Sequence, residues 1–382
     1  MTQVQNPIFK IHTLGQSIWM DNLSRNLIES GDLQAMIKKD GIRGITSNPA
    51  IFQKAIAGNE IYDADIESGI RAHQSVMDVY ESLIFDDIRN ACDVFLPLYV
   101  ESKGEDGFVS IEVPPTIAND TQSTLEQARR YAQAIDRPNV MIKIPGTPEG
   151  LPAVEQAIRE GINVNVTLLF SIESYIDTFW SFIRGLEGRL EDGNDIKSVK
   201  SVASFFLSRI DSNIDAKLEA KKAEIHDPEL EKKLSGLKGK VAIANAKLAY
   251  QEYKKILQSD RWAVLAEAGA TAQRLLWAST STKDPSYSDV MYVDELVGRD
   301  TVNTLPPVTI EACEDHCAAE NRVESNIEEA KQVIDSLKDP AINIELDQVM
   351  ADLLSEGIDK FIQPFESILQ SLETKANSLV NA

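Results

Sequence analysis

Val140-Met-Ile-Lys-Ile-Pro145 and Asn163-Val-Asn-Val-Thr-Leu-Leu-Phe170 are two short apolar runs with many β-branched residues, and a longer amphipathic stretch separates them. This order of strand, helix and strand is typical of a parallel βα unit, because parallel strands need a crossover connection between them. The chain repeats the pattern about eight times. The expected strands are 17–21, 44–48, 108–113, 140–144, 163–170, 202–207, 274–278 and 302–305.

Eight such units favour a closed barrel over an open sheet. We therefore expect an α/β fold, a (β/α)8 TIM barrel, over residues 1–310, with helices that include 76–100 and 125–135. The chain has 382 residues, whereas a barrel of this kind takes roughly 250, so additions are expected. Two regions lack a strand pattern: a helical insertion near 213–260 and a C-terminal helical extension over 311–382. Two separate compact domains are the alternative.

The charge is strongly acidic, with 60 Asp and Glu residues against 38 Lys and Arg and a net charge of −22. This charge repels polyanions, so we expect no nucleic-acid partner, and an anionic substrate would need local cations. Residues 311–382 carry 16 acidic and 5 basic residues, which is half of the net charge. Their apolar spacing of three and four predicts helices that pack on the barrel, away from the strand ends. The apolar positions are Val349, Leu353, Ile358, Ile362, Phe365 and Leu369.

Three cysteines, Cys92, Cys313 and Cys317, cannot all pair, which favours a reducing compartment and a cytoplasmic protein. The first seven residues lack the features of a signal peptide, and no apolar run approaches ~18 residues, so no membrane association is expected. Cys313 and Cys317 flank His316, yet a structural zinc site needs four ligands, so a helix with two half-buried cysteines is the preferred interpretation. Oxidation of these thiols as a form of regulation stays open, as does the oligomeric state.

Polar residues follow most of the expected strands. In a βα-barrel, the side chains that act on substrate lie at the C-terminal ends of the strands, so these residues define a candidate site. The polar residues at or just after strand ends are Asp21, Thr46, Ser47, Asn48, Glu112, Lys143, Asn163, Asn165, Thr167, Ser204, Arg209, Ser279, Thr280, Ser281 and Lys283.

Lys143 is the most informative of these residues because it lies inside an apolar strand. Burial there disfavours the ammonium ion and lowers the pKa of the amine, which yields the neutral nucleophile that a Schiff base requires. The alternative is a lysine that pairs with a carboxylate or reaches solvent at the strand end. Asp21 and Glu112 end other strands at the equivalent position, which favours the catalytic interpretation.

The segment Gly146-Thr-Pro-Glu-Gly150 follows the lysine strand and superficially suggests a phosphate-binding loop. It lacks the lysine and hydroxyl residue of a nucleotide-binding loop. A turn into a helix that begins near Pro152 is the preferred interpretation.

Several of these stretches together resemble the transaldolase family. They span about residues 14–310 in the family's order, and the length and helical C-terminus resemble the longer bacterial branch. Ser204 to Arg209 and Leu276-Trp-Ala-Ser-Thr280 support the resemblance. The main matching stretches are Trp19-Met-Asp-Asn-Leu-Ser24, Gly44-Ile-Thr-Ser-Asn-Pro49, Val109-Ser-Ile-Glu-Val113, Val140-Met-Ile-Lys-Ile-Pro145 and Gly161-Ile-Asn-Val-Asn-Val-Thr-Leu-Leu-Phe-Ser171.

The resemblance implies a transferase with an aldol mechanism that uses no metal and no cofactor. Lys143 would form an imine with the C2 carbonyl of a ketose phosphate. Asp21 would be the acid and base at the C4 hydroxyl, and Glu112 would move protons through a water that Thr167 also holds. The enzyme would transfer a dihydroxyacetone unit from sedoheptulose 7-phosphate or fructose 6-phosphate to glyceraldehyde 3-phosphate or erythrose 4-phosphate, in the non-oxidative pentose phosphate pathway.

The resemblance also implies how the sugar phosphates would be bound. Asn48 and Asn165 would hydrogen-bond the three-carbon fragment, while Ser204 and Arg209 would bind phosphate. Shorter family members carry an arginine shortly after the seventh strand, where this chain has Ser281 and then Lys283. Lys283 is therefore expected to be the second phosphate ligand, with ordinary surface exposure as the alternative. A simple aldolase that releases dihydroxyacetone, and a non-catalytic barrel that binds a partner through its acidic C-terminus, are the rival functions.

Overall fold

Eight parallel strands form a closed barrel in a computed structural model that describes residues 6–380. The strands follow one another around the barrel in sequence order, with β8 paired to β1. The expected (β/α)8 barrel is confirmed. The expectation about a signal peptide concerned mainly residues 1–5, which lie outside the described residues. The strands are β1 (Gln16–Asp21), β2 (Gly44–Thr46), β3 (Phe108–Glu112), β4 (Val140–Pro145), β5 (Val164–Leu169), β6 (Ser201–Phe206), β7 (Arg274–Ala278) and β8 (Thr301–Leu305).

Strand register places the polar residues of the sequence pattern at one level of the barrel. Lys143 in β4 pairs with Glu112 in β3 on one side and with Asn165 in β5 on the other. Asp21 in β1 pairs with Thr46 in β2. Every residue of β4, β5 and β6 is buried, because helices cover the outside of the barrel and side chains fill its interior.

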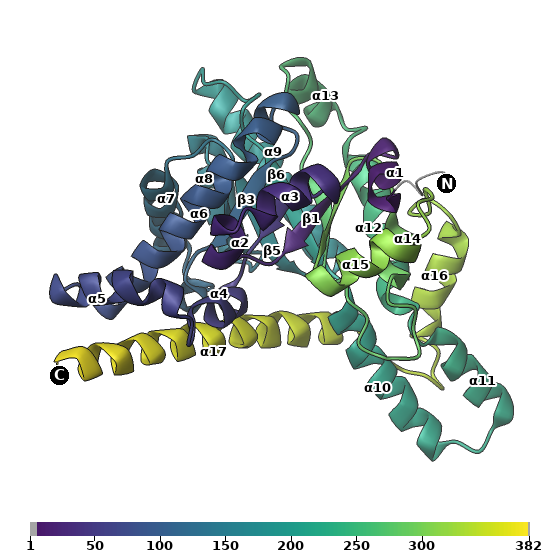
Figure 1. Cartoon of the computed structure of the whole chain (residues 1–382). Helices are drawn as coiled ribbons and strands as arrows, with labels where there is room; N and C mark the ends of the chain where they lie inside the picture. The colour runs from purple at the N-terminus through teal and green to yellow at the C-terminus, as the bar shows by residue number, and fades with distance from the viewer. Residues whose placement is uncertain (1–5, 381–382) are drawn as a thin grey trace, which may run out of the picture.

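Helices alternate with the strands and cover the outside of the barrel (Figure 1). The predicted helices 76–100 and 125–135 correspond to α6 and α7. The helix expected near Pro152 is α8, which begins two residues earlier. The helices up to α9 are α1 (Pro7–Thr13), α2 (Arg25–Glu29), α3 (Asp32–Lys39), α4 (Pro49–Ile56), α5 (Asp63–Arg71), α6 (Val76–Glu101), α7 (Thr121–Ile135), α8 (Gly150–Glu160) and α9 (Ile172–Glu191), with short 3-10 turns η1 (Glu60–Tyr62) and η2 (Pro115–Ile117).

The region near 213–260 is helical, as the sequence pattern predicts. The Asp227 side chain accepts a hydrogen bond from the backbone N–H of Glu229, and Pro228 occupies the first turn of α11, so Asp-Pro starts this helix. The helices here and before the C-terminal segment are α10 (Ser208–Glu224), α11 (Pro228–Leu237), α12 (Val241–Ile256), α13 (Asp260–Glu267) and α14 (Met291–Leu296).

The C-terminal segment forms α15 (Pro307–His316), α16 (Ile327–Ser336) and the 35-residue helix α17 (Leu346–Val380). Helix α17 packs against α4, α5, α6 and α10 and against β5, so it crosses the mouth of the barrel (Figure 1). The expectation that this segment lies away from the strand ends was wrong. Its buried side chains also differ from the predicted set, since Ile358, Ile362 and Leu369 are only half-buried. The buried side chains of α17 are Val349, Met350, Leu353, Phe361, Phe365, Ile368 and Leu372.

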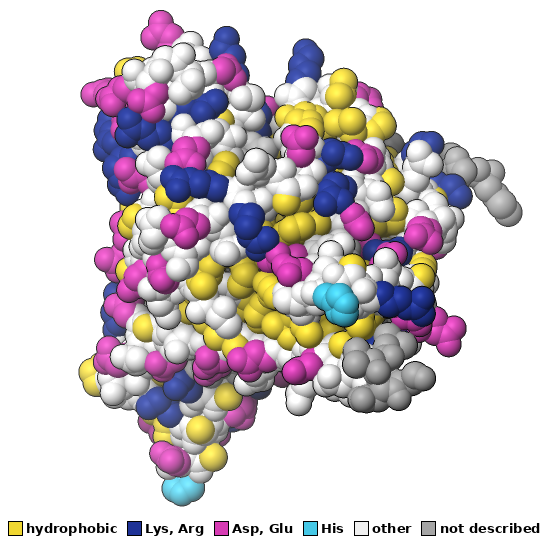
Figure 2. Space-filling model, turned by 90° about the vertical axis from the view of Figure 1, so that its left-hand side faces the viewer, with side chains coloured by type: hydrophobic (Ala, Val, Ile, Leu, Met, Phe, Trp, Pro, Cys, Tyr) yellow, Lys and Arg dark blue, Asp and Glu magenta, His cyan; other side chains and the backbone are white. Residues whose placement is uncertain are grey.

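Opposite charges alternate over the surface that Figure 2 shows, and no continuous field of Lys and Arg is visible on that face. Many of these charges form ion pairs between neighbouring helices, such as Arg129 with Glu160 and Arg159 with Asp192. Exposed pairs of this kind add little stability. In the described part of the chain, no helix is long and apolar enough to cross a membrane.

Candidate active site

A cavity of about 90 Å³ lies at the C-terminal ends of the strands. It brings together six of the nine predicted site residues: Asp21, Asn48, Lys143, Thr167, Ser204 and Arg209. Glu112, Asn165 and Lys283 are not part of the wall. The other residues of the cavity wall are Thr46, Phe206, Ala278, Ser279, Thr304 and Phe361.

Lys143 reaches the cavity from β4 and is only 5% exposed. Its Nζ donates a hydrogen bond to the backbone carbonyl of Ser47 at 2.9 Å. A carboxylate oxygen of Glu112 lies 3.6 Å from the same Nζ. The lysine therefore has the carboxylate partner of the alternative interpretation, and it also faces the cavity as the catalytic interpretation requires.

Glu112 lies directly beside Lys143 on the neighbouring strand and is buried. Burial raises the pKa of Glu112 to about 7, although the positive charge of Lys143 opposes this shift. Neither carboxylate oxygen has a hydrogen-bond partner among the described residues, and the same holds for the buried hydroxyl of Thr167. Glu112 is therefore a carboxyl group that exchanges protons near neutral pH and lies next to the amine.

Asp21 enters the cavity from the end of β1. The hydroxyl of Thr46 donates a hydrogen bond to it at 2.7 Å, and Thr46 in turn contacts the hydroxyl of Thr304 at 2.7 Å. Burial raises the pKa of Asp21, while the hydrogen bond from Thr46 and the charges of Lys143 and Arg209 lower it. The site thus contains two carboxyl groups in different surroundings, one beside the lysine and one across the cavity.

Asn48 occupies the start of α4, where its side-chain oxygen accepts a hydrogen bond from the N–H of Ile51 at 3.1 Å. Capping the helix fixes the amide, so its NH2 group is left for a ligand in the cavity. Asn165 lies behind the cavity wall: its oxygen accepts from the Ser204 hydroxyl at 2.7 Å and its nitrogen donates to Ser110 at 3.1 Å. Asn165 therefore orients Ser204, which does line the cavity.

Arg209 lies in the first turn of α10, and its guanidinium group lies between two aromatic rings. The guanidinium carbon is 5.1 Å from the ring centre of Phe206 and 5.8 Å from that of Phe361. Burial lowers the pKa of Arg209, although the carboxylates of Glu112, Glu356 and Asp21 oppose this. Its buried Nη1 has no hydrogen-bond partner among the described residues. Arg209 is thus a cation of the cavity wall whose Nη1 has no protein partner, and it lies next to the positive end of α10.

Lys283 lies outside the cavity and is exposed, with its Nζ donating to the Ser281 hydroxyl at 2.6 Å. Burial of part of the side chain and the charge of Arg209 lower its pKa. The influence of Arg209 shows that the two cations are close enough to interact. Its role as a phosphate ligand stays a prediction.

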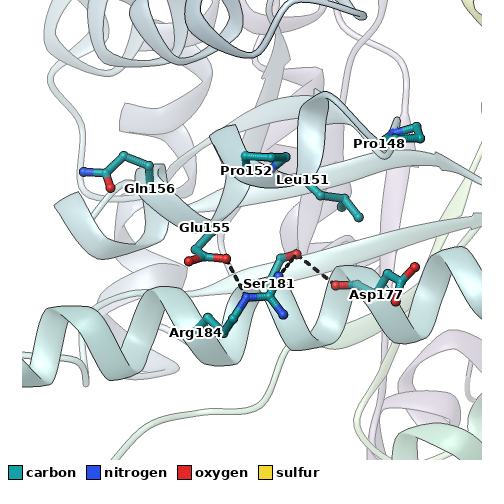
Figure 3. A pocket seen from close by; sticks show the side chains of 8 residues that line it. All are labelled: Pro148, Leu151, Pro152, Glu155, Gln156, Asp177, Ser181 and Arg184. Atoms are coloured by element: carbon teal, nitrogen blue, oxygen red, sulfur yellow. Dashed lines mark hydrogen bonds and ion pairs between the residues drawn. The ribbon is translucent and has the colours of Figure 1, made fainter.

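The loop over Gly146–Gly150 has a structural explanation. The Thr147 hydroxyl donates to the carbonyl of Ala118 and accepts from the N–H of Gly150, which fixes the turn into α8. A surface pocket beside this loop, drawn in Figure 3, lies between α8 and α9. Its one cation, Arg184, is paired with Glu155 and bonded to Ser181 (Figure 3). This pocket contains none of the predicted site residues.

The backbone of β5 is irregular where it meets the cavity. Leu168 has φ of 61°, and the register between β5 and β6 shifts between Val166 and Leu169. A positive φ at leucine costs of order 1–3 kcal/mol, and such bulges redirect side chains near active sites. Thr167 faces the cavity as a result, while Leu168 packs against Gly357 of α17.

Part of the cavity wall does not follow from the sequence pattern. The pattern includes Thr46 and Ser279 as polar strand ends but gives them no function, and it does not include Phe206 or Thr304. Phe361 is the most distant in sequence. Leu353, Gly357, Phe361 and Phe365 are spaced four residues apart, which is typical of one face of a helix. This pattern predicts that Phe361 is buried only if the glycine is counted as part of the packed face.

Possible metal ligands do not gather around this cavity or elsewhere in residues 6–380: no group of three or more His, Cys, Asp and Glu side chains has a suitable arrangement. Cys313 and Cys317 are buried at the end of α15, with their sulfur atoms 2.7 Å apart. The predicted helix is present, but the prediction that both cysteines are half-buried and lie on it was wrong, because both are buried and Cys317 directly follows the last residue of α15. Cys92 is a buried residue of α6 with a free thiol.

The fold and the cavity define a class of protein: a (β/α)8 barrel enzyme with a buried lysine beside a buried carboxyl group, and with a second carboxyl group and an arginine at the cavity wall. A model of the Transaldolase/Fructose-6-phosphate aldolase family matches residues 18–372. The transaldolase of Trichodesmium erythraeum strain IMS101 is 67% identical over 376 residues, which cover 98% of this chain and 99% of that protein. Transaldolase 2 of Nostoc sp. strain PCC 7120 is 66% identical, with 98% of each chain covered.

A more distant relative is the transaldolase of Thiobacillus denitrificans, which is 44% identical over 95% of this chain and 98% of its own. The chain therefore belongs to the transaldolase/fructose-6-phosphate aldolase family. It functions as a transaldolase, which is a transferase that acts on sugar phosphates.

Proposed function

We propose that this enzyme moves a dihydroxyacetone unit from a ketose phosphate to an aldose phosphate through an imine on Lys143. The donors would be sedoheptulose 7-phosphate or fructose 6-phosphate, and the acceptors glyceraldehyde 3-phosphate or erythrose 4-phosphate. The observation that supports this proposal best is the position of Lys143, which is buried at the cavity wall with Nζ 3.6 Å from a carboxylate oxygen of Glu112.

Imine formation requires a neutral amine and a group that accepts its proton. Glu112 is the nearest candidate, because its pKa of about 7 lets the carboxylate take a proton from Lys143 near neutral pH. The amine then adds to C2 of the ketose, and the carbinolamine loses its hydroxyl as water. The proton for that step would come from Glu112 through a water shared with Thr167, since both groups have buried oxygens without a protein partner.

Cleavage of the C3–C4 bond follows because the iminium nitrogen accepts the bonding electrons. Asp21 takes the proton of the C4 hydroxyl, so that C4 leaves as the aldehyde of an aldose phosphate and the three-carbon unit remains as an enamine. The acceptor aldehyde enters, the enamine carbon attacks it, and Asp21 returns its proton to the new alkoxide. Water then hydrolyses the imine, which frees Lys143 and releases the new ketose phosphate.

Binding would hold the three-carbon unit at one side of the cavity and phosphate at the other. The NH2 group of Asn48 and the Ser204 hydroxyl, which Asn165 orients, lie in the cavity near Lys143. Arg209 supplies the cation for phosphate, and its unpaired Nη1 and the N-terminus of α10 both favour an anion there. We also infer that Lys283 contributes to the phosphate site from outside the cavity wall.

A simple aldolase that releases dihydroxyacetone is the second candidate, because the matching family includes fructose-6-phosphate aldolase. The two functions share the imine and differ in the fate of the enamine, which either attacks an aldehyde or takes a proton from water. We propose transfer as the main reaction, in keeping with the printed names of the relatives.

A trapping experiment tests the proposal. The enzyme is incubated with fructose 6-phosphate and reduced with borohydride, and the modified peptide is identified by mass spectrometry. A three-carbon adduct on Lys143 is expected, whereas an unmodified Lys143 would overturn the mechanism. In a separate incubation without borohydride, the enzyme receives fructose 6-phosphate and erythrose 4-phosphate. Formation of a seven-carbon ketose phosphate would distinguish transfer from cleavage alone.

We infer that the enzyme acts in the cytoplasm, as the free thiols of Cys92, Cys313 and Cys317 suggest. Fractionation of the source cells, with the enzyme followed by its activity, tests this.

A further inference from the structure

Helix α17 comes very close to the substrate cavity at Gly357. A Cβ atom at this position would lie 2.9 Å from Cδ2 of Leu168 and 3.4 Å from Nη1 of Arg209. The distance to Leu168 is too short for a Cβ, so the helix fits against the bulge of β5 in this position because residue 357 has no side chain, whereas the distance to Arg209 is an ordinary contact. One turn later, Phe361 becomes part of the cavity wall.

Phe361 contacts both the lysine and the arginine of the cavity wall. Its ring centre is 5.9 Å from Nζ of Lys143 and 5.8 Å from the guanidinium carbon of Arg209. Its side chain is 4% exposed. Every other residue of the cavity wall comes from a strand of the barrel or from the loop or helix that follows one. Through Phe361, α17 therefore contacts both Lys143, where the proposed imine forms, and Arg209, the proposed phosphate ligand.

The cavity under Phe361 is small. Its volume of about 90 Å³ is well below the roughly 300 Å³ at the lower end of pockets that enclose drug-sized ligands. A six- or seven-carbon ketose phosphate needs more room than this, whereas a three-carbon unit is much smaller. With α17 in this position, the site matches the fragment that stays on Lys143 better than the complete donor.

The turn of α17 that carries Phe361 lacks one helical hydrogen bond. Pro364 has no N–H, so the hydrogen bond to the carbonyl of Lys360 is missing. Beyond the proline, the helix is held by the ring contact of Phe365 with Tyr80, by the Gln53–Ser367 hydrogen bond, and by the ion pair of Lys375 with Asp63. A shift of the Phe361 turn can therefore occur while the C-terminal half stays in place.

We propose that α17 is a lid over the substrate cavity and that Phe361 is the specificity-determining residue through which it acts. The lid moves outward to admit the ketose phosphate and closes over the three-carbon enamine after the aldose phosphate has left. Closure holds the fragment against Lys143 and keeps water from protonating the enamine. This inference rests on the proposed imine mechanism and adds to it a role for the C-terminal helix.

The test compares Phe361→Ala with Phe365→Ala in the full-length enzyme. Both variants remove the same ring from the same helix, but Phe365 packs against Tyr80 and does not line the cavity. The measured quantity is the ratio of free dihydroxyacetone to transfer product, with fructose 6-phosphate and erythrose 4-phosphate as substrates. We expect Phe361→Ala to raise this ratio about tenfold and Phe365→Ala to leave it within twofold of the native enzyme. Equal ratios in all three proteins would overturn the proposal.

A second measurement covers the case in which Phe361→Ala does not fold. Hydrogen exchange of residues 354–363 is followed in the native enzyme before and after borohydride trapping of the three-carbon adduct. Slower exchange in the trapped enzyme supports the lid, and unchanged exchange contradicts it. The trapping itself separates the two hypotheses: absence of an adduct refutes the imine mechanism, whereas an adduct with unchanged exchange and unchanged ratios refutes only the role of α17.

Discussion

Lys143 and Glu112 lie next to each other on adjacent strands, and burial and the nearby amine act on the pKa of the carboxyl group in opposite directions. Desolvation makes the carboxylate costly, while the nearby Nζ at 3.6 Å stabilises it. The result is a pKa of about 7 in place of an ordinary value near 4.5. Glu112 can therefore both accept and donate a proton near physiological pH, whereas a surface glutamate with an ordinary pKa stays deprotonated there.

Replacement of this carboxyl group tests its role. In the native enzyme, kcat/KM should rise as the pH increases through about 7, because the carboxylate form accepts the proton of Lys143. Glu112→Gln should lack this rise and should lower kcat by about 100-fold, the usual range for loss of an acid–base group. Activity profiles from pH 5.5 to 9 measure both effects. A pH profile in the variant that matches the native one would show that another group titrates.

Lys283 offers a second test at the scale of single residues. If it binds substrate phosphate, Lys283→Ala should raise the KM for fructose 6-phosphate several-fold and leave kcat nearly unchanged. Lys233→Ala is a suitable control, because Lys233 is a surface lysine paired with Asp339 in another part of the molecule. An unchanged KM in the Lys283 variant would show that Lys283 does not contribute to phosphate binding.

Helix α17 and strand β5 meet at a backbone bulge of β5 and a glycine of α17. The side chain of the strained Leu168 in β5 lies against Gly357, and the missing side chain of Gly357 lets α17 approach β5 this closely. Glycine inside a helix costs roughly 1 kcal/mol relative to alanine, so local helix stability alone favours alanine here. The close approach gives a structural reason for glycine at this position.

Gly357→Ala should accordingly weaken substrate binding although it improves the helix. We expect the KM for fructose 6-phosphate to rise several-fold, because the new Cβ would lie 2.9 Å from Cδ2 of Leu168 and would push α17 away from β5 and the cavity. Gly236→Ala is the matched control: Gly236 is an exposed glycine of α11 with open space around it, so its KM should not change. Equal KM values for both variants would mean that α17 adjusts without effect on the site.

At the scale of the whole molecule, the net charge of −22 and the buried carboxyl groups make stability depend on pH. Asp211, which is buried at the start of α10, accepts hydrogen bonds from the N–H of Ala242 and the hydroxyl of Tyr292. Burial raises its pKa to about 7, as it does for Glu112. In both cases the folded state binds more protons than the unfolded state between about pH 4.5 and 7, so stability falls as the pH rises through 7.

The free energy of unfolding should therefore be greater at pH 6.5 than at pH 8. For two groups with a folded pKa of about 7, the difference is about 1–2 kcal/mol, and equilibrium urea denaturation at several pH values measures it. Asp211→Asn should remove about half of this dependence. Asp192→Asn is the control, because Asp192 is exposed, has a lowered pKa and titrates in neither state above pH 6. A pH dependence that survives in Asp211→Asn would point to other groups.

The local sequence determined the order and position of the barrel elements. Alternating apolar runs located all eight strands, because burial on both faces requires continuous β-branched segments that no surface element shows. Polar residues at strand ends then located the cavity, since parallel strands in a closed barrel bring their C-terminal ends to one rim. Six of the nine predicted site residues line that cavity.

The tertiary structure decided what depends on distance between segments. Hydrogen bonds between strands place Asn165 behind Ser204 and not in the cavity wall. Burial next to Lys143 determines the pKa of Glu112. The position of α17 follows from packing over more than 150 residues of sequence, from Leu168 to Phe361. Periodicity shows that such a helix has a buried face. It does not show which surface buries that face, because hydrophobic contact has no direction and many surfaces satisfy it equally.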